Sequence, residues 1–75
     1  MLAAYILMQV STSDTMKPVR KVRAIDGVKL AHELLGPTDC IAFIEGSDLK
    51  AIGETIAAIR AVEGVERTDT RLAFG

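Results

Sequence analysis

The sequence is poor in the residues that usually stabilise a small protein or carry out chemistry. Cys40 is the single cysteine and His32 the single histidine among 75 residues, so neither an intrachain disulfide nor a Cys/His zinc site is expected. A chain of this length buries only about 60% of its unfolded surface, and such domains commonly add disulfides, a metal or further subunits. Because the sequence offers neither of the first two, we expect one domain that self-associates.

Motifs for catalysis and cofactor binding are missing as well. The sequence contains no GxSxG, GxxxxGK[ST], HExxH or GxGxxG pattern. Cys40 follows Asp39 in an apolar segment, and we interpret it as a small buried core residue. His32 is expected in packing or an interface, with a pH-sensitive contact as the alternative. We therefore expect no enzymatic activity, no metal and no cofactor.

Hydropathy and charge exclude two further classes of protein. The apolar run over residues 1–8 lacks a basic segment and is much shorter than the roughly 20 residues of a membrane span. We therefore expect a cytoplasmic protein. The net charge of −1 gives no general attraction to nucleic acid. Lys17, Arg20 and Lys21 recur at helical spacing just before Arg23, and we interpret them as an exposed, solvated helix face.

An internal repeat organises the chain. Residues 22–28 (VRAIDGV) align with residues 59–65 (IRAVEGV), 37 positions later, and every difference between them is conservative. Each copy has a short apolar strand, a helix, a Gly turn and a second strand. Ser47 is the expected N-cap of the second helix, and Pro18 fits the first turn of a helix that ends near Ala24. The predicted strands cover residues 3–10, 28–35, 40–45 and 65–74.

This order of elements predicts an α+β fold of the ferredoxin-like βαββαβ type. In that fold the first and third strands form the middle of a four-stranded antiparallel sheet, and two helices cover one face. Both strands are apolar on each side, since Tyr5 alternates with Ile6 and Ala42 with Phe43. The face without helices would leave a large apolar patch in water. We therefore expect a symmetric dimer that packs sheet on sheet.

Two polar segments are candidates for a ligand site. Ordinary turn chemistry and β-propensity explain both of them without a ligand. However, backbone N–H groups, a hydroxyl, a carboxylate and a guanidinium also complement the ammonium and carboxylate groups of an amino acid. At the level of the residues alone both interpretations stay open. The two segments are Gly36-Pro37-Thr38-Asp39, in the turn between the repeats, and Thr68-Asp69-Thr70-Arg71, on the last strand.

Three segments together resemble the effector domain of the Lrp/AsnC feast/famine transcriptional regulators, over nearly the whole chain. They are Ala24-Ile25-Asp26-Gly27-Val28, Leu35-Gly36-Pro37-Thr38-Asp39 and Gly64-Val65-Glu66-Arg67-Thr68-Asp69-Thr70-Arg71-Leu72. The resemblance implies dimers that pair their sheets and then assemble into octameric or decameric rings. It also implies that a small effector, usually an amino acid, binds between dimers near the turn that joins the second and third strands.

The resemblance also assigns residues and a domain organisation. Thr38 stands where the family often has an aromatic residue, a departure that leaves the effector unassigned. Full regulators carry an N-terminal helix-turn-helix domain, whereas this chain begins at the first strand. We therefore expect residues 1–75 to be a single stand-alone effector domain that makes no direct contact with nucleic acid. By position, the implied ligand-binding residues are Gly36, Pro37, Thr38, Asp39, Leu49, Thr70 and Arg71.

The favoured hypothesis is an oligomeric amino-acid sensor that modulates transcription or amino-acid metabolism, with full-length regulators as candidate partners. Its effector would stabilise whichever assembly binds it best. Two other functions stay open. A small dimeric ferredoxin-like enzyme would need a substrate pocket, and only Tyr5, Phe43 and Phe74 are aromatic here. A purely structural assembly subunit is favoured if the turn binds nothing.

Overall fold

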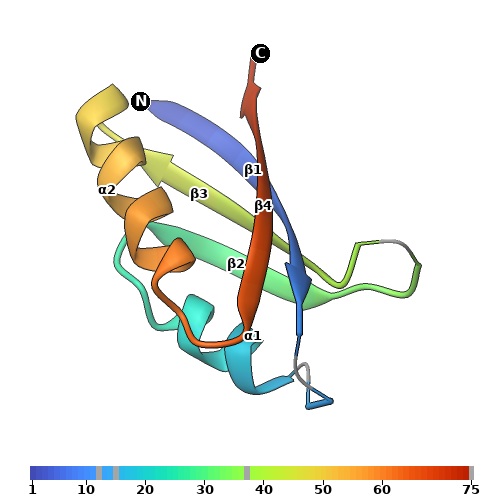
Figure 1. The fold of residues 1–75 in the computed structure, drawn as a ribbon. Helices are drawn as coiled ribbons and strands as arrows, with labels where there is room; N and C mark the ends of the chain where they lie inside the picture. The colour runs from blue at the N-terminus through green and yellow to red at the C-terminus, as the bar shows by residue number, and fades with distance from the viewer. Residues whose placement is uncertain (12, 15, 37, 75) are drawn as a thin grey trace.

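Two strand-helix-strand units follow one another along the chain, as the repeat predicts. The computed structural model describes residues 1–11, 13–14, 16–36 and 38–74. Figure 1 shows the strands gathered into one sheet, with the helices to one side of it. The elements are β1 (Leu2–Val10), α1 (Met16–Arg23), β2 (Val28–Glu33), β3 (Cys40–Gly46), α2 (Leu49–Arg60) and β4 (Val65–Ala73).

The sheet is antiparallel, with the strand order β2-β3-β1-β4 (Figure 1). The two most continuously apolar strands, β1 and β3, lie in the middle as predicted, where Ile6 faces Ala42 and Tyr5 faces Phe43. The outer strands carry most of the charged strand residues, which discourages pairing with unrelated chains. The ferredoxin-like fold predicted from the sequence is therefore confirmed.

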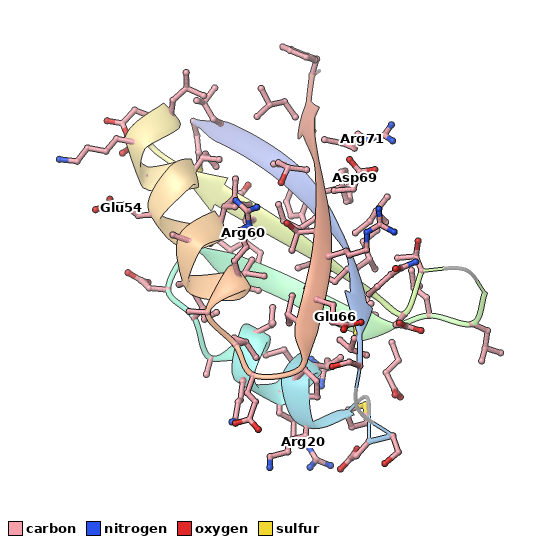
Figure 2. All side chains as sticks on the ribbon, viewed as in Figure 1. Arg20, Glu54, Arg60, Glu66, Asp69 and Arg71 are labelled. Carbon is pink, nitrogen blue, oxygen red and sulfur yellow. The ribbon has the colours of Figure 1, made fainter. Side chains whose placement is uncertain are left out.

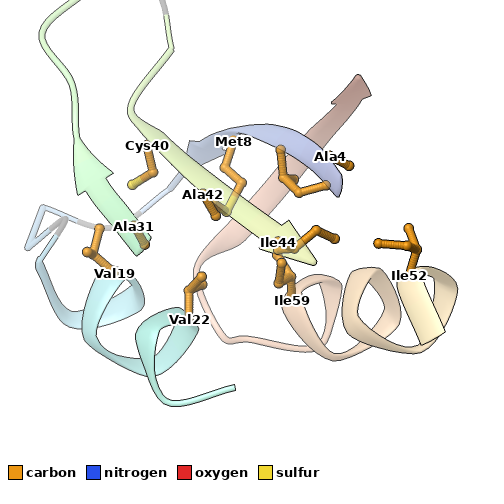
Figure 3. Close-up of a cluster of buried hydrophobic side chains, with 11 residues drawn as sticks. Ala4, Met8, Val19, Val22, Ala31, Cys40, Ala42, Ile44, Ile52 and Ile59 are labelled. Carbon is orange, nitrogen blue, oxygen red and sulfur yellow. The ribbon is translucent and has the colours of Figure 1, made fainter. Parts of the chain in front are cut away.

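The core lies between the sheet and the two helices, as Figure 3 shows. Its residues are aliphatic or contain sulfur, while Tyr5 and Phe74 remain 44% and 93% exposed. Full burial of one Ile or Met side chain contributes about 1.5–3 kcal/mol. The core residues are Ala4, Ile6 and Met8 on β1, Val19 and Val22 on α1, Ala31 on β2, Cys40, Ala42 and Ile44 on β3, and Ile52 and Ile59 on α2.

Both helices are short and amphipathic. The N-cap of α2 is Asp48, whose Oδ1 accepts a hydrogen bond of 2.8 Å from the Ala51 amide. The prediction of Ser47 was wrong by one residue, because α2 begins at Leu49 and the cap must directly precede it. Arg23, at the end of α1, donates from Nε to the Ala31 carbonyl on β2. Neither helix is long and apolar enough to cross a membrane, within the residues that the structure describes.

The second strand is shorter than predicted. It ends at Glu33, so Leu34 and Leu35 belong to the connection between β2 and β3. Leu35 is fully exposed, and no contact with the core draws it into the sheet. The apolar sequence alone therefore led to an overestimate of the length of this strand. A residue joins a strand only where it also has a partner strand and a face to pack on.

Glycines end both helical units, as predicted. Gly27 and Gly64 have φ angles of 96° and 97°, in the left-handed region that favours glycine. At Gly27 the backbone also passes close to α2, because a Cβ there would lie 2.6 Å from Oγ1 of Thr55. Thr55 is only 7% exposed, and its hydroxyl donates to the carbonyl oxygens of Asp26 and Ala51. Gly27 is thus required by its conformation and by its packing.

The face of the sheet opposite the helices, which we call the open face, is apolar at its centre. Tyr5 and Phe43 face each other there, with ring centroids 4.9 Å apart. Leu30 pairs with Phe43 and is 43% exposed, and Tyr5 is 44% exposed. The apolar part of the open face consists of Tyr5 and Leu7 on β1, Leu30 on β2, and Ile41 and Phe43 on β3. Arg67, Asp69 and Arg71 of β4 lie on the same face, because they pair with Gln9, Leu7 and Tyr5.

Two glycine substitutions separate the effects of backbone conformation and packing on stability from the effect of helix propensity. Gly27→Ala should lower the free energy of unfolding by about 2 kcal/mol or more, because it combines a strained φ angle with a clash against Thr55. Gly53→Ala should raise it by about 0.5–1 kcal/mol, since Gly53 lies within α2 and a Cβ there meets nothing within 4 Å. Urea denaturation of both variants measures the two changes, and equal stabilities would contradict this account of Gly27.

Candidate functional site

The connection between β2 and β3 is held in place by Asp39. Its amide donates to the Met8 carbonyl at 3.0 Å, and its own carbonyl accepts from the Leu34 amide at 2.8 Å. Its Oδ2 accepts a third bond, of 2.9 Å, from the amide of Val10, where β1 shifts register against β4. Asp39 therefore fixes the end of the connection against β1. Gly36 within it has a φ angle of 128°, which favours glycine, and Pro37 lies outside the described residues.

Charged side chains alternate along β4, on the side away from α2. Figure 2 shows Asp69 and Arg71 there, where Arg71 donates from Nη2 to Asp69 Oδ2 at 2.9 Å. The hydrogen bonds from Arg71 lower the pKa of the Asp69 carboxyl. In turn, the hydrogen bonds to Asp69 raise the pKa of Arg71. Both side chains are more than half exposed, so the pair contributes little to stability. Its charges remain available to a ligand or a partner.

A cleft of about 400 Å³ lies between this charged strand and the connection that Asp39 holds. Volumes of this size are typical of sites for small ligands. The lining offers a guanidinium from Arg67, a carboxylate from Asp69 and a hydroxyl from Thr38. These groups can bind a carboxylate, an ammonium group and a further polar atom. The cleft is lined by Leu7, Met8 and Gln9 of β1, Thr38 of the connection, and Arg67, Thr68 and Asp69 of β4.

Within one chain the structure brings some of the predicted ligand-binding residues together. Thr38 lines the cleft, Asp39 anchors the connection that forms one of its walls, and Arg71 adjoins it through its bond to Asp69. Gly36 lies in the same connection. These residues come from segments about 30 positions apart. The pairing of β1 with β4 and the hydrogen bonds of Asp39 to Met8 and Val10 place both segments beside β1.

Two predicted residues lie elsewhere in the same chain. Thr70 pairs with Ile6, a core residue, and so lies on the sheet face opposite that of Arg71. Leu49 starts α2 just beyond Gly46, at the end of β3 farthest from Cys40, and is 66% exposed. A role for these two in the same site requires a second copy of the chain. The shared site that the sequence analysis predicted therefore stays a prediction.

Besides the apolar Leu7 and Met8, sequence reasoning missed two polar residues of this cleft, Gln9 and Arg67. They face each other across β1 and β4. The period of two along β4 could have identified Arg67, because it shares a face with Asp69 and Arg71. Gln9 could be placed only with the register of β1 against β4, which the sequence does not state.

The remaining reactive side chain, Cys40, is in the core. Burial raises the pKa of its thiol above the ordinary value, and the negative charges of Asp39 and Glu33 raise it further. A buried, protonated thiol is a poor nucleophile and a poor metal ligand, which agrees with the core role predicted for it. Among the described residues, no group of three His, Cys, Asp or Glu side chains is placed to hold a metal ion.

Comparison with known proteins places this fold and cleft in context. The family model described as the Lrp/AsnC ligand binding domain matches residues 3–75. The HTH-type transcriptional regulator LysM of Saccharolobus solfataricus is 30% identical over 69 residues, which cover 89% of this chain and 49% of LysM. The chain thus spans about half the length of that curated relative.

Solved structures share the fold over the whole chain. A protein from Thermus thermophilus superposes with a TM-score of 0.91 at 26% identity, covering 100% of this chain and 95% of that one. A transcriptional regulator from Neisseria meningitidis, solved as a complex with L-Met, gives 0.84 at 19% identity and covers 99% of this chain and 50% of that one. From the family match over residues 3–75, the chain belongs to the family of Lrp/AsnC ligand binding domains.

Proposed function

We propose that this domain binds an amino acid at a site shared between copies and thereby adjusts the activity of a transcriptional regulator. The observation that carries the proposal is the cleft between Thr38 and β4, which presents a guanidinium and a carboxylate side by side. The family match supplies the class, a ligand-binding domain, and LysM is named as a regulator. The proposed role is binding rather than catalysis, in the cytoplasm where transcription takes place.

The chemistry of the cleft supports an amino acid as the effector. Arg67 can donate two hydrogen bonds to a carboxylate, and Asp69 can accept from an ammonium group. Thr38 is small, which leaves room for the side chain of the ligand. The L-Met complex of the Neisseria meningitidis regulator makes amino acids the first class to test.

A second copy of the chain is part of the proposal. Tyr5 and Leu30 of the open face are each more than 40% exposed, in a domain too small to leave many apolar residues in water. A second open face would cover them in a symmetric, sheet-on-sheet dimer. Such dimers would assemble further into octameric or decameric rings, with or without full-length regulators. The effector would then act by linkage, favouring the assembly that binds it more tightly.

Two leucines with matched exposure test the dimer. Leu30→Glu should convert the dimer to a monomer, because it places a charge within the apolar open face. Leu72→Glu should leave the dimer intact, since Leu72 is 47% exposed but pairs with Ala4 and so lies on the other side of the sheet. Sedimentation velocity at micromolar concentration measures both. A wild-type monomer, or a Leu30→Glu dimer of undiminished stability, would contradict the proposal.

Thermal melting with single amino acids tests the ligand. An effector at 100 times its dissociation constant adds about 2.7 kcal/mol of stability. For a domain of this size, each kcal/mol raises the melting temperature by about 4–8 °C. Arg67→Gln should abolish the shift, because it removes the group proposed to hold the carboxylate.

Arg60→Gln is the matched control for this measurement, since it removes an exposed arginine on α2 outside the cleft. It should keep the full shift in melting temperature. If none of the twenty amino acids stabilises the protein, a purely structural assembly role replaces the sensor. A shift that survives Arg67→Gln would move the binding site away from this cleft.

A further inference from the structure

Three cations on α1 have no ion-pair partner among the residues that the structure describes. Lys17, Arg20 and Lys21 are all exposed, and the one salt bridge in the described part of the chain joins Asp69 to Arg71. Figure 2 shows Arg20 reaching away from the body of the molecule. Helical spacing puts the three on one face, which we call the cationic face. The sequence analysis interpreted it as a solvated surface.

An anionic cleft of about 550 Å³ lies beside the other helix. Its walls are the turn that follows α1, the end of β3 and one side of α2. Asp26, Glu45 and Glu54 contribute carboxylates to its lining, and Lys29 is the one cation among the described residues there. Gly27 and Thr55 lie in the lining too, where the backbone passes close to α2.

The internal repeat relates this anionic cleft to a smaller one beside α1. The smaller cleft, of about 170 Å³, includes Lys17, Pro18 and Lys21 of α1. A shift of 37 residues carries these three positions onto Glu54, Thr55 and Ala58, which all line the anionic cleft. The same shift relates Glu63 and Gly64 to Asp26 and Gly27. The two units therefore carry equivalent clefts whose helix walls differ in charge, with lysines on α1 and a glutamate on α2.

The two charged surfaces lie apart in one molecule. Figure 2 shows Arg20 and Glu54 extending into solvent from different helices and in different directions. Glu63 shares the smaller cleft with Lys17 and Lys21, and Lys29 shares the other cleft with its three carboxylates. Each surface therefore keeps an excess of one sign of charge. A second copy of the chain supplies both complements at once.

We propose that the cationic face of α1 in one copy docks against the anionic cleft beside α2 in another copy. This contact joins two different surfaces, so it is head-to-tail and extends an assembly into a ring or a filament. Pairing through the open face joins two identical surfaces, so it forms a dimer and goes no further. The contact rests on the proposed function only in using that dimer as its building block, and it supplies the step from dimer to ring.

Charge complementarity favours a second copy over a nucleic acid as the partner. A nucleic acid would engage the cations and leave the three carboxylates of the cleft unused, and the net charge of the chain is −1. Between copies, three cations meet three carboxylates and one lysine. Exposed charges of this kind act within about 8 Å at physiological salt and steer association. The larger assembly should therefore weaken as salt is raised.

Reciprocal charge reversal tests the contact. Lys17→Glu/Lys21→Glu reverses the cationic face, and Asp26→Lys/Glu54→Lys reverses the cleft. Sedimentation velocity and native mass spectrometry should show wild-type species larger than a dimer, whereas each variant alone stops at the dimer, with association beyond it at least ~10-fold weaker. An equal mixture of the two variants should regain the larger species, because the reversed helix of one then meets the reversed cleft of the other.

Lys50→Glu/Arg60→Glu is the control, since it makes the same change in net charge as Lys17→Glu/Lys21→Glu but on exposed positions of α2 outside both clefts. It should keep the wild-type assembly. The proposal is overturned if the wild type stops at a dimer, if either reversed variant assembles normally, or if the mixture regains nothing. Failure of the open-face dimer appears differently, as monomers in the wild type and in Leu72→Glu, so the two results are distinguishable.

Discussion

The structure depends on the antiparallel pairing of β1 with β3, two strands that are apolar on both sides. Their inner residues, such as Ile6 and Ala42, are completely buried beneath the helices. Their outer residues, such as Tyr5 and Phe43, are then forced onto the opposite face. One pairing thus builds the core and creates the surface that a second copy would cover. Stability and the proposed association therefore have the same origin in this domain.

Much of the fold could be predicted because two periodic signals agree with each other. The repeat of 37 residues sets the order of elements, and alternation within residues 3–10 and 40–45 identifies the central strands. Predictions failed at the ends of elements, where one residue decides where a helix begins or a strand stops. The cap of α2 is Asp48 rather than Ser47, because both residues can cap and only the start of the helix selects one. The end of β2 depends on a partner strand, which local sequence does not encode.

The candidate site was harder to predict because its residues meet only through the register in which β1 pairs with β4. Thr38 and Asp39 could be found as turn residues next to a strand, and Asp69 and Arg71 as an alternating polar pair. Their meeting depends on how β1 pairs with β4, and that register also brings Gln9 opposite Arg67. Leu49 was placed by family position alone, and Thr70 as a member of the polar segment on the last strand. Positions that act across an interface between copies carry no signal of that geometry within one chain.

The hydrogen bonds of Asp39 have a consequence for how the proposed site can change its ligand. The carboxylate and backbone of this residue tie the connection to Met8, Leu34 and Val10, so both ends of the segment are set by the sheet. Between those ends, Leu35 and Gly36 are exposed and make no contribution to the core. Substitutions of Leu35 leave the free energy of folding largely unaltered, whereas Gly36 is constrained by its φ angle of 128°. Under the proposed function, ligand specificity can therefore change in this segment while the scaffold that presents it stays constant.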